Sequence, residues 1–91
     1  MMIQQQLIPV DVICMCSAEG TIRPLRLRLE DEDRQMLRMD ILEVVGVKHI
    51  PYVGAEANLF ICRGRVGKQE WMVELRYAIR SHTWSLLRRI Y

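Results

Sequence analysis

The sequence predicts one small, mainly β domain, an antiparallel meander of five or six strands that curls into a closed or nearly closed barrel. Short segments with alternating apolar and polar side chains recur along the 91 residues, and turn-forming residues separate them at short intervals. A sheet this small exposes two strand edges unless it closes on itself. Because the length suits one domain and no linker or repeat interrupts the pattern, we expect residues 1–91 to form a single domain.

The first predicted strand covers residues 10–16, an apolar run that contains β-branched side chains. Residues 1–9 precede it as an N-terminal segment, which is either flexible or paired with the edge of another subunit. Met1, Met2, Ile3, Leu7 and Ile8 would supply the apolar contacts in the second case. A tight turn follows the strand, with Gly20 at a position that favours positive φ.

The second predicted strand, residues 22–30, has the clearest alternation in the chain. Pro24 lies near its start, where a missing amide hydrogen is tolerated. Because successive side chains of a strand point to opposite faces, the pattern predicts one apolar and one charged face. The apolar face comprises Leu25, Leu27 and Leu29, and the charged face comprises Arg26, Arg28 and Glu30.

Residues 34–45 fit two patterns. With a period of two, Leu37, Met39 and Ile41 share one face of a strand. With a period of 3.6, the same stretch is a short helix that begins after Asp33 and ends before Gly46. The neighbouring strands favour a strand here, and the helix remains the alternative.

The rest of the chain continues the meander. Residues 46–58 are rich in turn formers and predict a loop, with a short strand possible at 47–50. Three further strands are expected, at 59–66, 70–78 and 83–91. In the middle one, alternation places four side chains on one face, which we interpret as the core face: Trp71, Val73, Leu75 and Tyr77.

The C-terminal part of the chain resembles small bacterial SH3-like or curled-sheet barrel families of unknown function. In those families a strand with a Leu-x-Tyr pair turns into a Trp-x-Leu-x-Arg strand. The matching residues here are Leu75, Tyr77, Trp84, Leu86 and Arg88. The resemblance covers residues 37–91 and implies an SH3-like barrel, and it transfers no functional residue, because small β-barrels carry many activities.

Charge is unevenly distributed. The formal net charge is +2, whereas residues 59–91 carry six Arg and one Lys against Glu70 and Glu74, a net charge of +5. Arginine and lysine on neighbouring strands suit phosphate groups. We therefore expect a non-enzymatic binding module with nucleic acid as the candidate partner, and a protein-interaction or self-associating module as the alternative. The candidate contact residues are Arg63, Arg65, Lys68, Arg76 and Arg80.

No motif predicts catalysis, a metal site or a cofactor. Cys14, Cys16 and Cys62 lack the usual zinc-knuckle spacing and are expected to be core residues. His82 lies between Ser81 and Thr83, but adjacency in sequence does not build a catalytic triad. Residues 30–33 form an acidic turn without the ligand spacing of a calcium loop. The N-terminal residues lack the basic region of a signal peptide, Pro9 and Asp11 interrupt any apolar region, and no apolar run reaches about 20 residues. We therefore expect a cytoplasmic protein with three reduced thiols, outside the membrane.

Overall fold

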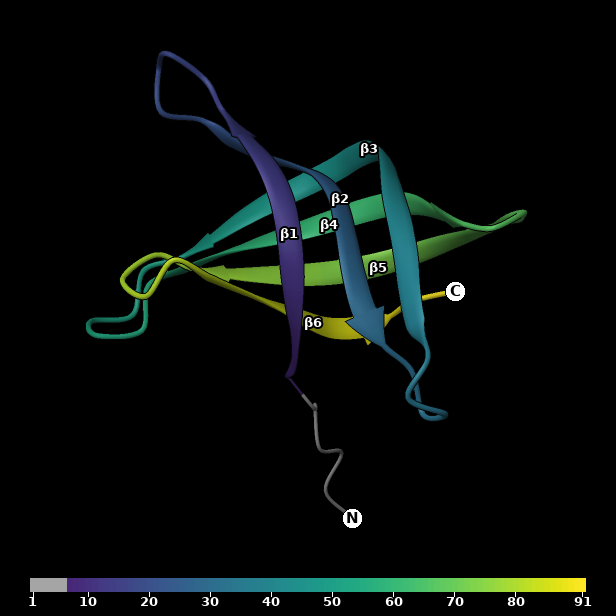
Figure 1. The fold of residues 1–91 in the computed structure, drawn as a ribbon. Coiled ribbons are helices and arrows are strands. Elements are labelled where there is room, and N and C mark those ends of the chain that lie inside the picture. Colours follow the sequence, from purple (N-terminus) through teal and green to yellow (C-terminus); the bar gives the residue numbers. More distant parts are fainter. Residues whose placement is uncertain (1–6) are drawn as a thin grey trace.

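Six antiparallel strands form a closed barrel in the computed structural model, which describes residues 7–91 (Figure 1). Each strand pairs with the next one in the chain, and β6 returns to β1. The strands are β1 (Ile8–Cys16), β2 (Ile22–Glu30), β3 (Met36–Ile50), β4 (Ala57–Val66), β5 (Gln69–Ala78) and β6 (Thr83–Arg89).

The architecture confirms the predicted all-β barrel, with six strands rather than five. It is compatible with SH3-like and OB-like barrels. Closure depends on a short contact, because β1 and β6 are paired only from Ile8 to Val10 on β1. Strand β1 thus begins inside the predicted N-terminal segment, while Met1, Met2 and Ile3 lie outside the described residues. Within residues 7–91 no helix is long and apolar enough to cross a bilayer.

Strand β3 resolves the ambiguity at residues 34–45. The stretch is a strand from Met36 onward and the helix alternative is wrong, because its backbone pairs with β2 and then with β4. Met39 is fully buried and Leu37 and Ile41 pack against the core, as the period of two predicts.

The predicted loop at 46–58 is confirmed only at residues 51–56, and the short strand that the sequence allowed at 47–50 is present as the end of β3. Strand β3 continues to Ile50 and β4 begins at Ala57, so the connection shrinks to residues 51–56. His49 lies opposite Asn58, and the ring Nδ1 of His49 is 2.9 Å from the amide oxygen of Asn58. Pairing between β3 and β4 thus keeps residues 46–50 and 57–58 extended, although their glycine and polar residues suggested a loop.

Short turns connect the hairpins. Val66 pairs with Gln69, so Gly67 and Lys68 alone make the β4–β5 turn, and Gly67 has a φ of 60°. In the acidic β2–β3 turn, one carboxylate oxygen of Asp31 accepts hydrogen bonds from the backbone N–H groups of Asp33 (2.9 Å) and Gln35 (2.8 Å). These bonds give the acidic turn a local structural role.

The core fills the barrel with side chains from all six strands. Trp84 packs between two other aromatic rings of the core, with its ring centroid 4.9 Å from that of Tyr77 and 5.3 Å from that of Phe60. The interpretation of β5 is confirmed, since Val73, Leu75 and Tyr77 are buried and Trp71 is partly buried. The buried cluster comprises Val10, Leu27, Leu29, Met39, Phe60, Cys62, Val73, Leu75, Tyr77, Trp84 and Leu86.

Strand β2 departs from its predicted pattern at one residue. The register with β1 shifts so that Ile13 lies opposite Arg26 and Cys14 opposite Pro24, which leaves Leu25 without a partner. This β-bulge turns Leu25 to the surface, where it is 39% exposed, and buries Pro24 instead. Leu27 and Leu29 are buried as predicted.

Candidate interaction surface

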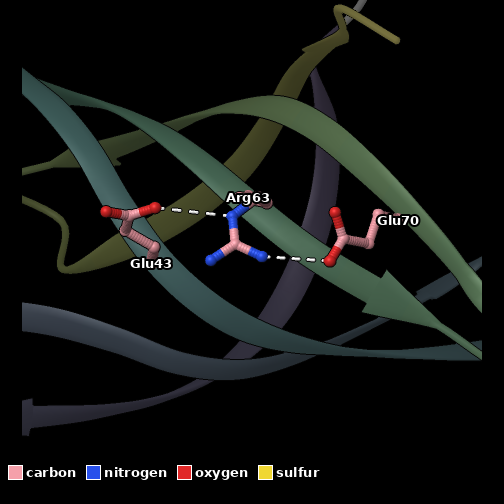
Figure 2. A network of polar contacts seen from close by, with 3 residues as sticks. All are labelled: Glu43, Arg63 and Glu70. Atoms are coloured by element: carbon pink, nitrogen blue, oxygen red, sulfur yellow. Dashed lines mark hydrogen bonds and ion pairs between the residues drawn. The ribbon is translucent and has the colours of Figure 1, made fainter.

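Arg63, the central member of the predicted basic face, lies between two carboxylates (Figure 2). Its Nε is 3.4 Å from Oε1 of Glu43 on β3, and its Nη1 donates a hydrogen bond to Oε1 of Glu70 on β5 at 3.0 Å. Both acids lie on strands that pair with β4: Glu43 is directly opposite Arg63 on β3, and Glu70 is on β5. The positive charge of Arg63 is therefore largely compensated within the domain.

The other four predicted cations do not converge. Arg65 is exposed near the β4–β5 turn that contains Lys68, whereas Arg76 lies further along β5 and Arg80 is in the β5–β6 turn. These two turns are at opposite ends of β5 (Figure 1). Within residues 7–91 none of these four makes an ion pair, so no carboxylate compensates their positive charges there.

The outer face of the first three strands carries arginines that are also compensated. Nε of Arg26 donates to Asp40 at 2.9 Å, and Nε of Arg38 is 3.4 Å from the same carboxylate oxygen. Arg28 donates to Asp11 through two nitrogens, at 3.0 and 2.9 Å. Desolvation acts to raise the pKa of Asp40, but the hydrogen bonds and charges of Arg26 and Arg38 outweigh it and lower the pKa below its usual value. A hollow of about 380 Å³ lies on this face, and the charged side chains that line it already form ion pairs.

The cysteines divide into two environments. Cys62 is in the core, as predicted, and burial raises the pKa of its thiol to about 12. The prediction that Cys14 and Cys16 are core residues is wrong, because both are exposed on the part of β1 that extends beyond the barrel with β2. Among residues 7–91 no cluster of three metal-ligating side chains is present.

We expect a thiol-specific reagent to modify two of the three cysteines rapidly in the folded protein. Cys14 and Cys16 are accessible, whereas Cys62 is buried and protonated at neutral pH, and only a thiolate attacks. Mass spectrometry after brief treatment with iodoacetamide should find label on Cys14 and Cys16, with Cys62 labelled only after denaturant is added. Rapid labelling of Cys62 in the native state would contradict its placement.

The residues around His82 are committed to turn contacts. His82 adopts a positive φ of 57°, and its Nδ1 is 2.8 Å from the hydroxyl of Tyr77. The hydroxyl of Ser81 lies 2.7 Å from that of Thr83. Ser81 is thus not hydrogen-bonded to His82. Instead, the Tyr77–His82 and Ser81–Thr83 contacts stabilise the β5–β6 turn.

The distal half of β3 has a free edge. Strand β3 pairs with β2 only over Met36 to Asp40, but with β4 over Asp40 to Ile50. Figure 1 shows β3 bending where these pairings meet, while the β1–β2 hairpin points away from the second half. Among residues 7–91, residues 41–50, here called the free edge, therefore have a strand partner on one side only.

A groove of about 430 Å³ opens where β2 and β3 separate. Its walls come from residues 23–25 of β2 and 41–44 of β3. Two β-bulges in the pairing with β4 leave Leu42 and Val45 unpaired. Apolar side chains are exposed along both walls and onward along the free edge: Leu25 (39%), Leu42 (37%), Val45 (57%) and Val47 (60%).

Sequence reasoning missed this surface. The apolar residues of 41–45 look like core residues of a strand or helix, residues 46–50 fall within the predicted loop, and only the partial pairing with β2 shows that this stretch is an uncovered strand edge. The one available signal was the length of the apolar pattern, which runs past the point where β2 can pair with it.

Comparison of the chain with protein-family models, curated protein sequences and solved structures finds no match.

Proposed function

We propose that this domain is a non-enzymatic protein-binding module that accepts an extended segment of another polypeptide as an added strand on the free edge. The observation that carries the proposal is the one-sided pairing of residues 41–50 beside exposed apolar side chains. Unpaired backbone N–H and C=O groups of an edge strand supply affinity for an incoming strand, and adjacent side chains supply selectivity. We also propose that the barrel is of the SH3-like type, because residues 37–91 resemble those families. No function is carried over from them.

The aromatic residues support protein binding over nucleic-acid binding. Phe60, Tyr77 and Trp84 are in the core, and the ring of Trp71 is covered by the guanidinium of Arg89 at 3.9 Å from its centroid. Tyr52 and Tyr91 are exposed, but they lie in the β3–β4 connection and after β6, not on the strands that carry Arg65 and Arg76. A single-stranded nucleic acid needs exposed rings on which its bases stack. Aliphatic side chains are the ones exposed along the free edge, and they suit a polypeptide partner.

An extended peptide selected from a displayed random library is expected to bind at the free edge. Titration of the peptide into labelled protein at low micromolar concentration should shift the backbone amide resonances of residues 41–50. Val47→Lys should weaken binding about tenfold or more, because a charge on an edge opposes strand addition. Val53→Lys is the matched control, since Val53 is fully exposed in the β3–β4 connection. Shifts centred on another face, or equal effects of the two lysines, would contradict the proposal.

Nucleic-acid binding is the second candidate, and one observation favours it. Arg65, Lys68, Arg76 and Arg80 make no ion pair within the described part of the chain. Fluorescence anisotropy with labelled DNA and RNA at low and physiological salt separates the two candidates, because phosphate contacts weaken steeply with salt. Salt-sensitive binding that Arg65→Ala and Arg76→Ala abolish would favour this second function over strand addition.

A further inference from the structure

We propose that the free edge pairs with the same edge of a second copy of this chain, antiparallel, about a two-fold axis between Val45 and Gly46. The inference rests on the proposed function and names the strand that is added. The pairing would join the two barrels through one continuous sheet in which the β3 strands are neighbours. Such an isologous contact uses one surface of each copy and closes at a dimer.

The sequence of the free edge is self-complementary in this register. Val45 lies opposite Gly46 of the second copy, Val44 opposite Val47, and Glu43 opposite Lys48. By symmetry each pair occurs twice. The dimer therefore gains two ion pairs and two valine pairs, and directly opposed pairs of these kinds stabilise a sheet.

The side chains that must meet lie on matching faces. Opposed residues of an antiparallel pair point to the same side, so each face is identified by the partner on β4. Glu43 is opposite Arg63 and Lys48 is opposite Leu59, both on the outer side of the barrel. Val44 and Val47 are opposite Cys62 and Phe60, which are both buried. The register thus places the two charges beside each other on the outer face, and the two valines beside each other on the face that they share with Cys62 and Phe60.

The charges are available for this contact. Glu43 is 59% exposed and uses only Oε1 toward Arg63. Lys48 is exposed and makes no ion pair among residues 7–91. A pairing centred on Lys48 or on Glu43 would oppose like charges, and a shift of two residues would separate both ion pairs. Charge therefore selects one register among the antiparallel ones.

The bulge at Val45 fits the two-fold axis. A bulge increases the local right-handed twist of its strand, so a strand added at this edge must adopt a similar twist. Two copies related by a two-fold axis have the same twist at the same place. Among residues 7–91, the side of β1 that faces away from β2 also lacks a strand partner at residues 11–16. Asp11 is the charged residue of that stretch and forms an ion pair with Arg28 at 2.9 Å, so this edge offers no self-complementary charges.

Sedimentation velocity over a range of concentrations tests the proposal with a charge exchange. Lys48→Glu places a carboxylate opposite Glu43 at both symmetry-related positions, and should raise the Kd of the dimer about tenfold or more. The double variant Glu43→Lys/Lys48→Glu restores opposite charges and should recover the Kd. Glu70, which is 3.0 Å from Arg63 in the wild type, remains available to compensate Arg63 in that variant, and circular dichroism should show that each variant is folded. Lys68→Glu, in the distant β4–β5 turn, is the matched control and should leave the Kd unchanged.

The outcomes separate this inference from the proposed function. A wild-type protein that is monomeric at millimolar concentration overturns the dimer, as does a dimer that Lys48→Glu leaves intact or that the double variant fails to restore. If the protein is monomeric but selected peptides still shift the amides of residues 41–50, the proposed function stands and the self-pairing falls. If neither the second copy nor a peptide contacts these residues, both fall.

Discussion

Replacement of Gly64 by alanine is expected to destabilise the barrel, although it adds a single methyl group. Gly64 is buried on β4 directly beneath the side chain of Met39 on β3. A Cβ atom at this position would lie 2.6 Å from Sδ and 2.7 Å from Cγ of Met39. Because Met39 is itself fully buried, it must move against packed neighbours, and such overpacking costs about 1–3 kcal/mol.

A double-mutant cycle identifies the cause of that loss. Met39→Ala alone should cost about 2–5 kcal/mol through the cavity that it leaves. In Gly64→Ala/Met39→Ala the new methyl group occupies part of this cavity, so the double variant should be more stable than the sum of the single effects by about 1 kcal/mol or more. Urea unfolding followed by the fluorescence of Trp71 and Trp84 measures these differences.

The matched control is Gly46→Ala, in which the added Cβ meets no atom within 4 Å. We expect its free energy of unfolding to stay close to that of the wild type. If Gly64→Ala is equally harmless, or if the two substitutions at Gly64 and Met39 are additive, the close approach of these residues is wrong.

Leu27→Ala is expected to destabilise the domain far more than Leu25→Ala. Leu27 is 1% exposed and Leu25 is 39% exposed, although they are two residues apart on one strand. Truncation of a buried leucine costs about 2–5 kcal/mol, a large fraction of the roughly 5–15 kcal/mol that holds a typical domain together. Truncation of Leu25 should cost less than about 1 kcal/mol, as is usual for surface positions.

The pair tests the β-bulge, because a regular strand would bury both leucines equally. The measurement is the midpoint of thermal or urea unfolding for the two variants under the same conditions. Equal losses would mean that Leu25 shares the core face with Leu27 and that the register shift between Ile13 and Cys14 is absent. A small effect of Leu25→Ala would also fit its place on the wall of the groove.

Much of the barrel was predictable from the sequence because local chemistry and the fold agree there. Strand β5 alternates without interruption, so its buried face, Val73, Leu75 and Tyr77, follows from the period of two. The Gly67-Lys68 turn follows in the same way, since a two-residue hairpin favours glycine with positive φ. Local sequence also placed the strand boundaries within a few residues over most of the chain.

What tertiary structure alone decides is how far each pairing extends and which charges meet. Bulges at Leu25, Leu42 and Val45 depend on the register between strands, and each exposes an apolar side chain that alternation assigns to the core or leaves ambiguous. The basic C-terminal third is a property of the sequence. The compensation of Arg63 is not, because the carboxylates that neutralise it come from two other strands. Alternation and turn residues determine an all-β domain with excess arginine in its C-terminal third, and cross-strand register determines which strand edge of it is left unpaired among residues 7–91.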